Sequence, residues 1–107
     1  SVISINCAKM GMHRFRELKI GQRRMDLAEN VYRVVAGFPT EEKYGLTPQL
    51  KRCAVSVPAN ISEGAGRPTN KQFKFFLEVA MDSCNEVQTQ IELAQRFGYV
   101  QPEQARY

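Results

Sequence analysis

The stretch YGLTPQLKRCAVSVPANISEGAGR, residues 44–67, decides the fold, because it combines a helix start, an apolar stripe, an internal proline and a glycine-rich end. Thr47 is expected to cap the helix and Pro48 to be its first residue, where a missing N–H is no loss. Gly64 and Gly66 are expected to end it. Spacings of three and four, typical of one buried helix face, join its apolar residues. These are Leu50, Cys53, Ala54, Val57 and Ile61.

Pro58 lies inside this apolar stripe. It removes the backbone hydrogen bond to the carbonyl of Ala54, so we expect the helix to bend or to open locally. Ser56, Asn60 and Ser62 are small polar residues that could bond the freed carbonyl or reach across to a neighbouring helix.

The preceding segment predicts a helix from about Phe15 to Gly37. Gly21 should cost about 1 kcal/mol relative to alanine, which leaves open a start after it. Phe38 and Tyr44, in the short polar connection, are expected to plug the end of the bundle. The predicted apolar stripe consists of Leu18, Met25, Ala28, Tyr32 and Val35.

The following segment has the strongest periodicity and predicts a helix from Thr69 to Phe97, roughly 40 Å long. Thr69 and Gln72 have the spacing of a capping box, and Gly98 is expected to end the helix. Its predicted core stripe is Phe73, Leu77, Ala80, Cys84, Val87, Ile91 and Ala94, with Phe76 and Val79 beside it. Pro102 and Glu103 resemble the first turn of a fourth helix. Together these patterns predict an all-α, up-and-down helical bundle.

Length and composition indicate one globular domain. The chain has 107 residues, 43% hydrophobic and 24% charged, and it contains no apolar run of the roughly 18 residues that cross a bilayer. We expect residues 1–13 to be a disordered leader or a remnant added in cloning, and residues 14–107 to form the domain. Three cysteines without metal-ligand spacing suit a reducing cytoplasm. A disulfide between Cys53 and Cys84 is conceivable, but buried thiols are the favoured interpretation.

Charge is distributed unevenly along the chain. Residues 1–75 contain 13 Lys and Arg against 6 Asp and Glu, whereas residues 76–107 contain 2 against 5. Such a protein could bind polyanions at its basic end or stack on copies of itself, although scattered, solvated charges are the alternative. The candidate nucleic-acid-binding residues are Arg16, Lys19, Arg23 and Arg24, and a second group around the helix corner, Lys51, Arg52, Arg67, Lys71 and Lys74. No aromatic residues are expected to interleave with these cations, so binding should be electrostatic and poorly sequence-selective.

Candidate catalytic and metal sites are missing from the sequence. His13 is the single histidine, and the separation of six residues between Glu86 and Glu92 does not place them on one helical face. Residues 64–66, GAG, lack the preceding strand of a nucleotide-binding loop. We therefore expect no catalytic residue, metal or cofactor.

Residues 57–67, VPANISEGAGR, match a V-P-x-N-x-x-E-G-x-G-R signature in order. With FRELKI (15–20), FPTEEKYGLTPQLKR (38–52) and IELAQRFGYV (91–100), the chain resembles the four-helix-bundle family named for 23S rRNA intervening-sequence proteins. The resemblance implies a left-handed four-helix bundle similar to the accessory variability proteins of diversity-generating retroelements. Those proteins are ring-shaped homopentamers that bind nucleic acid and a reverse transcriptase. Two departures are Gly21, where tryptophan is common, and a fourth helix that is truncated or missing.

The signature residues Asn60, Glu63 and Arg67 share one helix face and allow two interpretations. In the structural one, Glu63 pairs with Arg67 and Asn60 repairs the backbone near Pro58. In the functional one, this face meets a neighbouring subunit or a ligand, and Gly64 belongs to the same signature. We expect a non-enzymatic, oligomeric protein that binds RNA or DNA; the alternative is an interaction module that docks a partner helix or a nucleic-acid enzyme.

Overall fold

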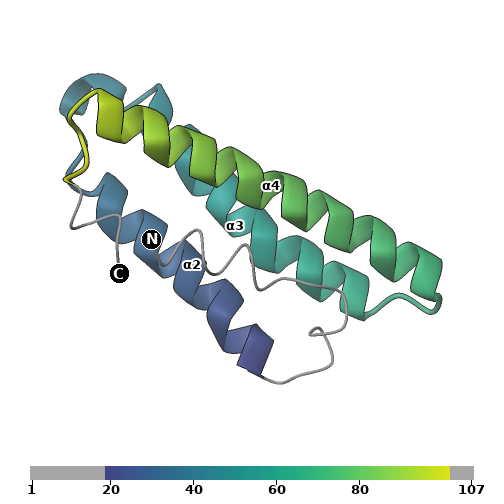
Figure 1. Cartoon of the computed structure of the whole chain (residues 1–107). Helices are drawn as coiled ribbons and strands as arrows, with labels where there is room; N and C mark the ends of the chain where they lie inside the picture. The colour runs from purple at the N-terminus through teal and green to yellow at the C-terminus, as the bar shows by residue number, and fades with distance from the viewer. Residues whose placement is uncertain (1–18, 102–107) are drawn as a thin grey trace.

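The computed structural model describes residues 19–101, with side chains from residue 25 onward. It contains three α-helices, α2 (Lys19–Val35), α3 (Leu46–Ala65) and α4 (Asn70–Arg96), and one 3-10 turn, η2 (Thr40–Glu42). The helices run antiparallel to their chain neighbours, and α3 packs against both α2 and α4 (Figure 1). No strand occurs within these residues, so the predicted all-α class is confirmed.

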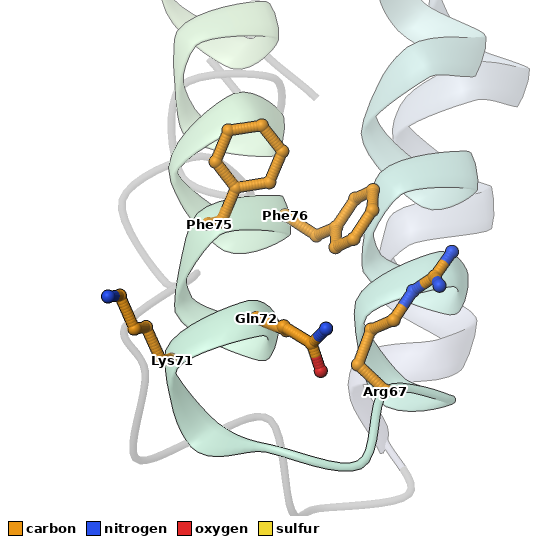
Figure 2. Close-up of a pocket in the computed structure, with 5 residues that line it drawn as sticks. All are labelled: Arg67, Lys71, Gln72, Phe75 and Phe76. Carbon is orange, nitrogen blue, oxygen red and sulfur yellow. The ribbon is translucent and has the colours of Figure 1, made fainter.

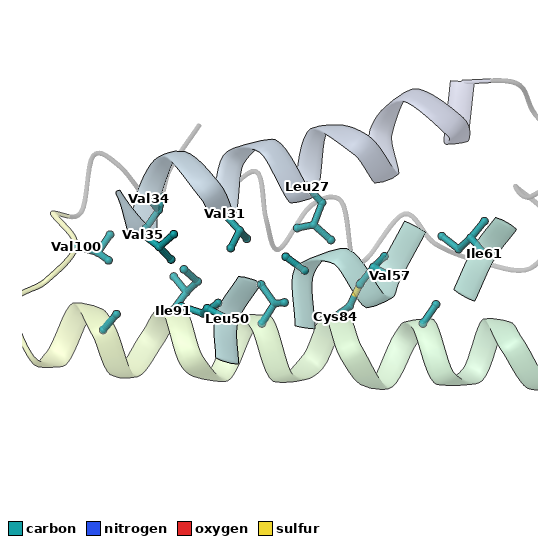
Figure 3. Packing of buried hydrophobic residues seen from close by; sticks show 14 of the residues in the cluster. Leu27, Val31, Val34, Val35, Leu50, Val57, Ile61, Cys84, Ile91 and Val100 are labelled. Carbon is teal, nitrogen blue, oxygen red and sulfur yellow. The ribbon is translucent and has the colours of Figure 1, made fainter. Parts of the chain in front are cut away.

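All three helices contribute aliphatic side chains to a single core (Figure 3). The predicted stripe of α3 is buried throughout except for Cys53, which is half-buried. The predicted stripe of α4 is buried except for Phe73, which still packs against the core. Both stripes are therefore confirmed, and their burial is the main source of stability for helices that would be marginal alone.

The predicted core face of α2 is wrong. Met25 is 53% exposed and Tyr32 is 45% exposed, and of that stripe only Val35 is buried among the residues described. Leu18 lies outside the described residues. The face that packs on α3 is made by Leu27, Val31, Val34 and Val35. Branched aliphatic side chains fill this interface, while Tyr32 lies outside with its hydroxyl within reach of water.

The predicted cap of α3 is also wrong. The helix begins at Leu46, one residue before Thr47, and its N-cap is Gly45, which supplies no side-chain hydrogen bond. Instead the N–H of Leu46 donates to Oε1 of Glu42, at 3.0 Å. A carboxylate from the preceding turn thus satisfies a backbone donor that the helix leaves open. Tyr44, predicted to plug the bundle, is exposed.

Gly64 lies inside α3 and does not end it. The helix extends to Ala65, and the C-cap is Gly66, whose N–H donates to the carbonyl of Glu63. Gly64 is buried, and a Cβ placed there would lie 2.8 Å from the Cβ of Phe76. Its function is to let α3 and α4 approach closely.

Polar side chains surround Pro58, which is buried within the continuous helix α3. Nδ2 of Asn60 donates to the carbonyl oxygen of Ser56, at 2.7 Å, and to its Oγ, at 2.9 Å. The hydroxyls of Ser56 and Ser83 are hydrogen-bonded at 2.9 Å, which joins α3 to α4. The predicted bond across helices is confirmed, while the amide of Asn60 reaches the carbonyl of Ser56 and not that of Ala54.

The ends of α4 follow the predicted signals. Oγ1 of Thr69 accepts a hydrogen bond from the N–H of Gln72 at 3.2 Å, and its hydroxyl donates to Oε1 of Gln72. Gly98 has a φ of 80°, the left-handed conformation that favours glycine after a helix. Phe38 packs against Tyr99 with ring centroids 5.6 Å apart, which confirms it as a partial plug.

Candidate nucleic-acid interface

A surface hollow of about 420 Å³ lies where α3 passes into α4. We call it the corner hollow, and it is lined by Arg67, Lys71, Gln72, Phe75 and Phe76. Figure 2 shows Gln72 and Phe76 pointing toward Arg67, Lys71 pointing away from it, and the ring of Phe75 between Lys71 and Phe76. The hollow therefore has aromatic rings in its middle and a cation on each side.

The rings and the guanidinium of the corner hollow contact one another directly. The guanidinium of Arg67 lies over the ring of Phe76, 5.0 Å from its centroid. Phe75 and Phe76 meet edge to face at a centroid distance of 5.3 Å. Arg67 also forms an ion pair with Glu63, which confirms the predicted pair. Arg67 is thus held in place by a carboxylate and a ring, and Phe76 by Arg67 and Phe75.

Positive charge at this corner exceeds the negative charge, because only Arg67 among its described basic residues has an acidic partner, Glu63. No Asp or Glu occurs in the sequence between Glu63 and Glu78, while Arg67, Lys71 and Lys74 fall in that interval. Among the side chains of residues 25–101, the ion pairs join Arg33, Arg67 and Arg96 each to a glutamate four residues earlier, and neither Lys71 nor Lys74 takes part in one. The corner can therefore attract a polyanion.

A second hollow, of about 450 Å³, lies between α2 and the first half of α3. Its lining consists of Tyr32, Lys51, Arg52, Val55 and Ser56. The ammonium group of Lys51 lies over the ring of Tyr32, 5.1 Å from the centroid. The outward position of Tyr32, which the predicted α2 stripe did not anticipate, thus serves this cation–π contact.

The five basic residues predicted around the helix corner do not form one cluster. Arg67, Lys71 and Lys74 are at the α3–α4 corner, but Lys51 and Arg52 lie 16 and 15 residues before Arg67. At about 1.5 Å per residue, this separation is roughly 24 Å along the helix. Lys19, Arg23 and Arg24 belong to α2, though their side chains are not described, and Arg16 lies outside the described residues.

Aromatic residues do interleave with the cations, so the contrary prediction is wrong. Lys71 and Phe75, and Gln72 and Phe76, are spaced four apart on α4 and therefore neighbour each other on its surface. The signal was present in the run KQFKFF, residues 71–76. It was obscured because Phe73 in the same run packs against the core.

The signature residues have structural positions in this site. Pro58 and Gly64 are buried, and Asn60 bonds within α3. Glu63 orients Arg67, the one signature residue that lines the hollow. The structural interpretation of the signature is supported, and Arg67 also connects it to the candidate interface.

A separate polar group joins α3 to α4 near the middle of the bundle. The thiol of Cys53 donates to Oε2 of Glu86 at 3.1 Å, and Nε2 of Gln90 donates to the Sγ of Cys53 at 3.6 Å. Burial raises the pKa of the Cys53 thiol, and the bond to Glu86 raises it further. A reactive cysteine requires the opposite shift, so the thiol is no candidate nucleophile. Cys84 is buried and forms no disulfide with Cys53, and His13 and Cys7 lie outside the described residues.

Two further searches covered the described part of the chain. Residues 19–101 contain no group of three or more His, Cys, Asp or Glu side chains able to hold a metal ion. None of the helices in this range is long and apolar enough to cross a membrane.

Antiparallel α-helices around an aliphatic core, with basic and aromatic hollows on the surface, define an all-α bundle protein whose surface is its candidate site. Residues 16–107 match the protein family described as 23S rRNA-intervening sequence protein, and the chain belongs to this family. This confirms the family inferred from the VPANISEGAGR signature. A search of curated proteins gave no significant match.

Proposed function

We propose that this chain is a non-enzymatic, oligomeric helical-bundle protein that binds RNA or DNA through its basic surface with low sequence selectivity. The observation that carries the proposal is the lining of the two hollows. Each contains two basic residues and at least one aromatic residue, and no acidic residue lines either of them. Phosphate backbones bind such surfaces through charge, and aromatic rings accept any base.

The proposed assembly is a left-handed four-helix bundle, similar to the accessory variability proteins of diversity-generating retroelements. By this similarity we propose a homopentamer that assists a reverse transcriptase or another nucleic-acid enzyme in the cytoplasm. A ring would repeat the corner hollow around its circumference. Support for this part comes from the signature residues and from the local excess of positive charge.

Titration of a labelled single-stranded RNA of random sequence at several salt concentrations tests the proposal. We expect the logarithm of affinity to fall linearly with the logarithm of salt concentration, by about 0.7 per phosphate contacted. Replacing Lys71 and Lys74 with glutamine should lower this slope by about 1.4, because two phosphate contacts are lost. Arg96→Gln is the matched control, since Arg96 is exposed and is paired with Glu92 at the other end of α4. Absence of binding at low salt, or binding without a salt slope, would contradict the proposal.

A second candidate function is a protein-interaction module that docks a partner helix. Exposed apolar residues on two helices favour it, namely Met25 on α2 and Leu93 on α4 with Phe97 just beyond its end. Measurement of the solution mass and capture from a nuclease-treated lysate distinguish the two functions. A partner retained after nuclease treatment, together with no affinity for RNA, would favour the interaction module.

A further inference from the structure

We infer that the corner hollow binds an unpaired base of a single strand, with the base stacked on Phe75 and the adjoining phosphates on Arg67 and Lys71. This inference rests on the proposed function and gives it a ligand: single-stranded nucleic acid, not duplex. Three observations carry it, namely the exposed ring of Phe75, the bracing of that ring, and the positions of the two cations.

Phe75 presents an apolar ring to solvent in a basic environment. It is 58% exposed, although it belongs to the helix that contributes the longest core stripe. Lys71 lies one helix turn before it on the same face of α4, and Glu78 lies nearly one turn after it. An exposed ring with a cation one turn away suits a ligand that is both flat and anionic, and nucleotides have this combination.

Neighbouring side chains restrict the motion of the Phe75 ring. Phe76 meets Phe75 edge to face, and the guanidinium of Arg67 covers Phe76. Phe76 in turn lies beside Gly64, where α3 and α4 are so close that a Cβ on the glycine would clash with Phe76. A stacking platform held in this way loses little conformational entropy when a base binds.

The cations lie on either side of the rings. Figure 2 shows Arg67 at the end of α3 and Lys71 on the far side of the first turns of α4, with the aromatic residues between them. A nucleotide within a strand also has one phosphate on each side of its base-bearing sugar. In a duplex the face of each base is covered by its neighbours, so only an unpaired base can use the ring.

Gln72 adds a polar group to the same lining. Its Oε1 accepts a hydrogen bond from the hydroxyl of Thr69, which orients the amide. The amide NH₂ carries two donors, and acceptors are present on the edges of all four bases. Contact with this group would therefore favour no single base, in agreement with low sequence selectivity.

Fluorescence anisotropy with two probes tests the inference. The first probe is an oligothymidylate of about a dozen nucleotides, within the usual site size for single strands. The second is an abasic strand of the same length and charge. We expect the unsubstituted protein to bind the oligothymidylate at least ~5-fold more tightly than the abasic strand, as the loss of one stacked base requires.

Variants at Phe75 then locate the base. Phe75→Ala should weaken binding of the oligothymidylate about 5-fold or more and leave binding of the abasic strand unchanged. Phe75→Tyr keeps a ring and should retain the affinity. Phe97→Ala is the matched control, because Phe97 is also 58% exposed and also meets another ring, that of Tyr99. Circular dichroism verifies that each variant is folded.

The possible results distinguish a failure of this inference from a failure of the proposed function. Equal, salt-dependent binding of both probes overturns the inference and leaves the proposed function intact. Failure to bind either probe at low salt overturns both. If Phe75→Ala lowers the solution mass while affinity for oligothymidylate is unchanged, the exposed ring belongs to a contact between copies of the chain, and the inference is wrong.

Discussion

Replacing Gly64 with alanine tests how much of the stability depends on the close packing of α3 against α4. Helix propensity, which alanine increases, acts in the opposite direction. The added Cβ would lie 2.8 Å from the Cβ of Phe76 and 3.0 Å from the Cδ1 of Phe73. Carbon atoms pack best at about 3.5–4.0 Å, so the first contact is short by about 1 Å. The Cβ of Phe76 is fixed to the backbone and cannot rotate away. Relief therefore requires α3 and α4 to move apart.

Two opposing terms set the expected size of the effect. Overpacking of this kind costs about 1–3 kcal/mol in the free energy of unfolding. Alanine in place of glycine within a helix contributes up to about 1 kcal/mol of stability. Gly64 is the penultimate residue of α3, where the gain is smallest because helix ends fray. We expect a net loss of about 1–2 kcal/mol.

Urea denaturation followed by circular dichroism measures this loss. With a slope of about 1–3 kcal/mol per molar urea, the midpoint should fall by about 1 M. Gly66→Ala is the matched control, since a Cβ there has no neighbour closer than the carbonyl oxygen of Glu63 at 3.7 Å, and its φ of −88° suits alanine. If Gly64→Ala is as stable as Gly66→Ala, the argument from close approach is refuted.

Three further predictions use the same denaturation assay. Thr69→Ala should cost about 1 kcal/mol, because the N–H of Gln72 loses its cap; an unchanged midpoint would show that water replaces the hydroxyl. Leu50→Ala, at a fully buried position, should cost about 2–5 kcal/mol, whereas Val55→Ala on the exposed face of the same helix should change stability by less than about 0.5 kcal/mol; similar losses would contradict the assigned core face. The hydroxyl of Tyr99 donates to Glu42 at 2.9 Å, and this bond raises the pKa of Tyr99. The stabilisation is fully present below the ordinary tyrosine pKa of about 10 and is lost as pH rises through the raised value; the advantage over Tyr99→Phe should disappear at alkaline pH, and a constant difference would refute the assignment.

The core of α3 and α4 could be predicted from the sequence, whereas the core of α2 could not. The α4 stripe runs from Phe73 to Ala94 within a helix of 27 residues, so an alternative face would bury charged side chains such as Glu78 and Glu92. In α2 two apolar stripes compete, one through Met25 and Tyr32 and the other through Leu27 and Val31. Periodicity is the same for both. In the structure the aliphatic residues Leu27 and Val31 are buried against α3, and Tyr32 lies at the surface with Lys51 of α3 over its ring. Both contacts depend on α3, so α2 alone does not show which stripe is buried.

The basic residues of the candidate site could be named from the sequence, but the hollow could not. Arg67 and Lys71 line the same hollow, because a short turn joins the two helices. The position of Lys51 depends on how far α3 extends before the corner, which a count of residues could have given. The exposure of Phe75 follows from helical periodicity, since Phe75 comes two residues after Phe73 and so lies on the face of α4 away from the core stripe.

The hydrogen bond between Ser56 and Ser83 also helps to fix where α3 sits along α4. Aliphatic stripes with alternating spacings of three and four would remain in contact if one helix slid by a turn, about 5.4 Å. The bond between Ser56 and Ser83 has no such freedom, because a slide would separate the two hydroxyls, whereas Asn60 bonds within α3 and would move with it. Leaving a polar group unpaired in an interface costs up to about 1–3 kcal/mol. The bundle therefore has one axial alignment, and the corner hollow, which takes side chains from both helices, has one shape.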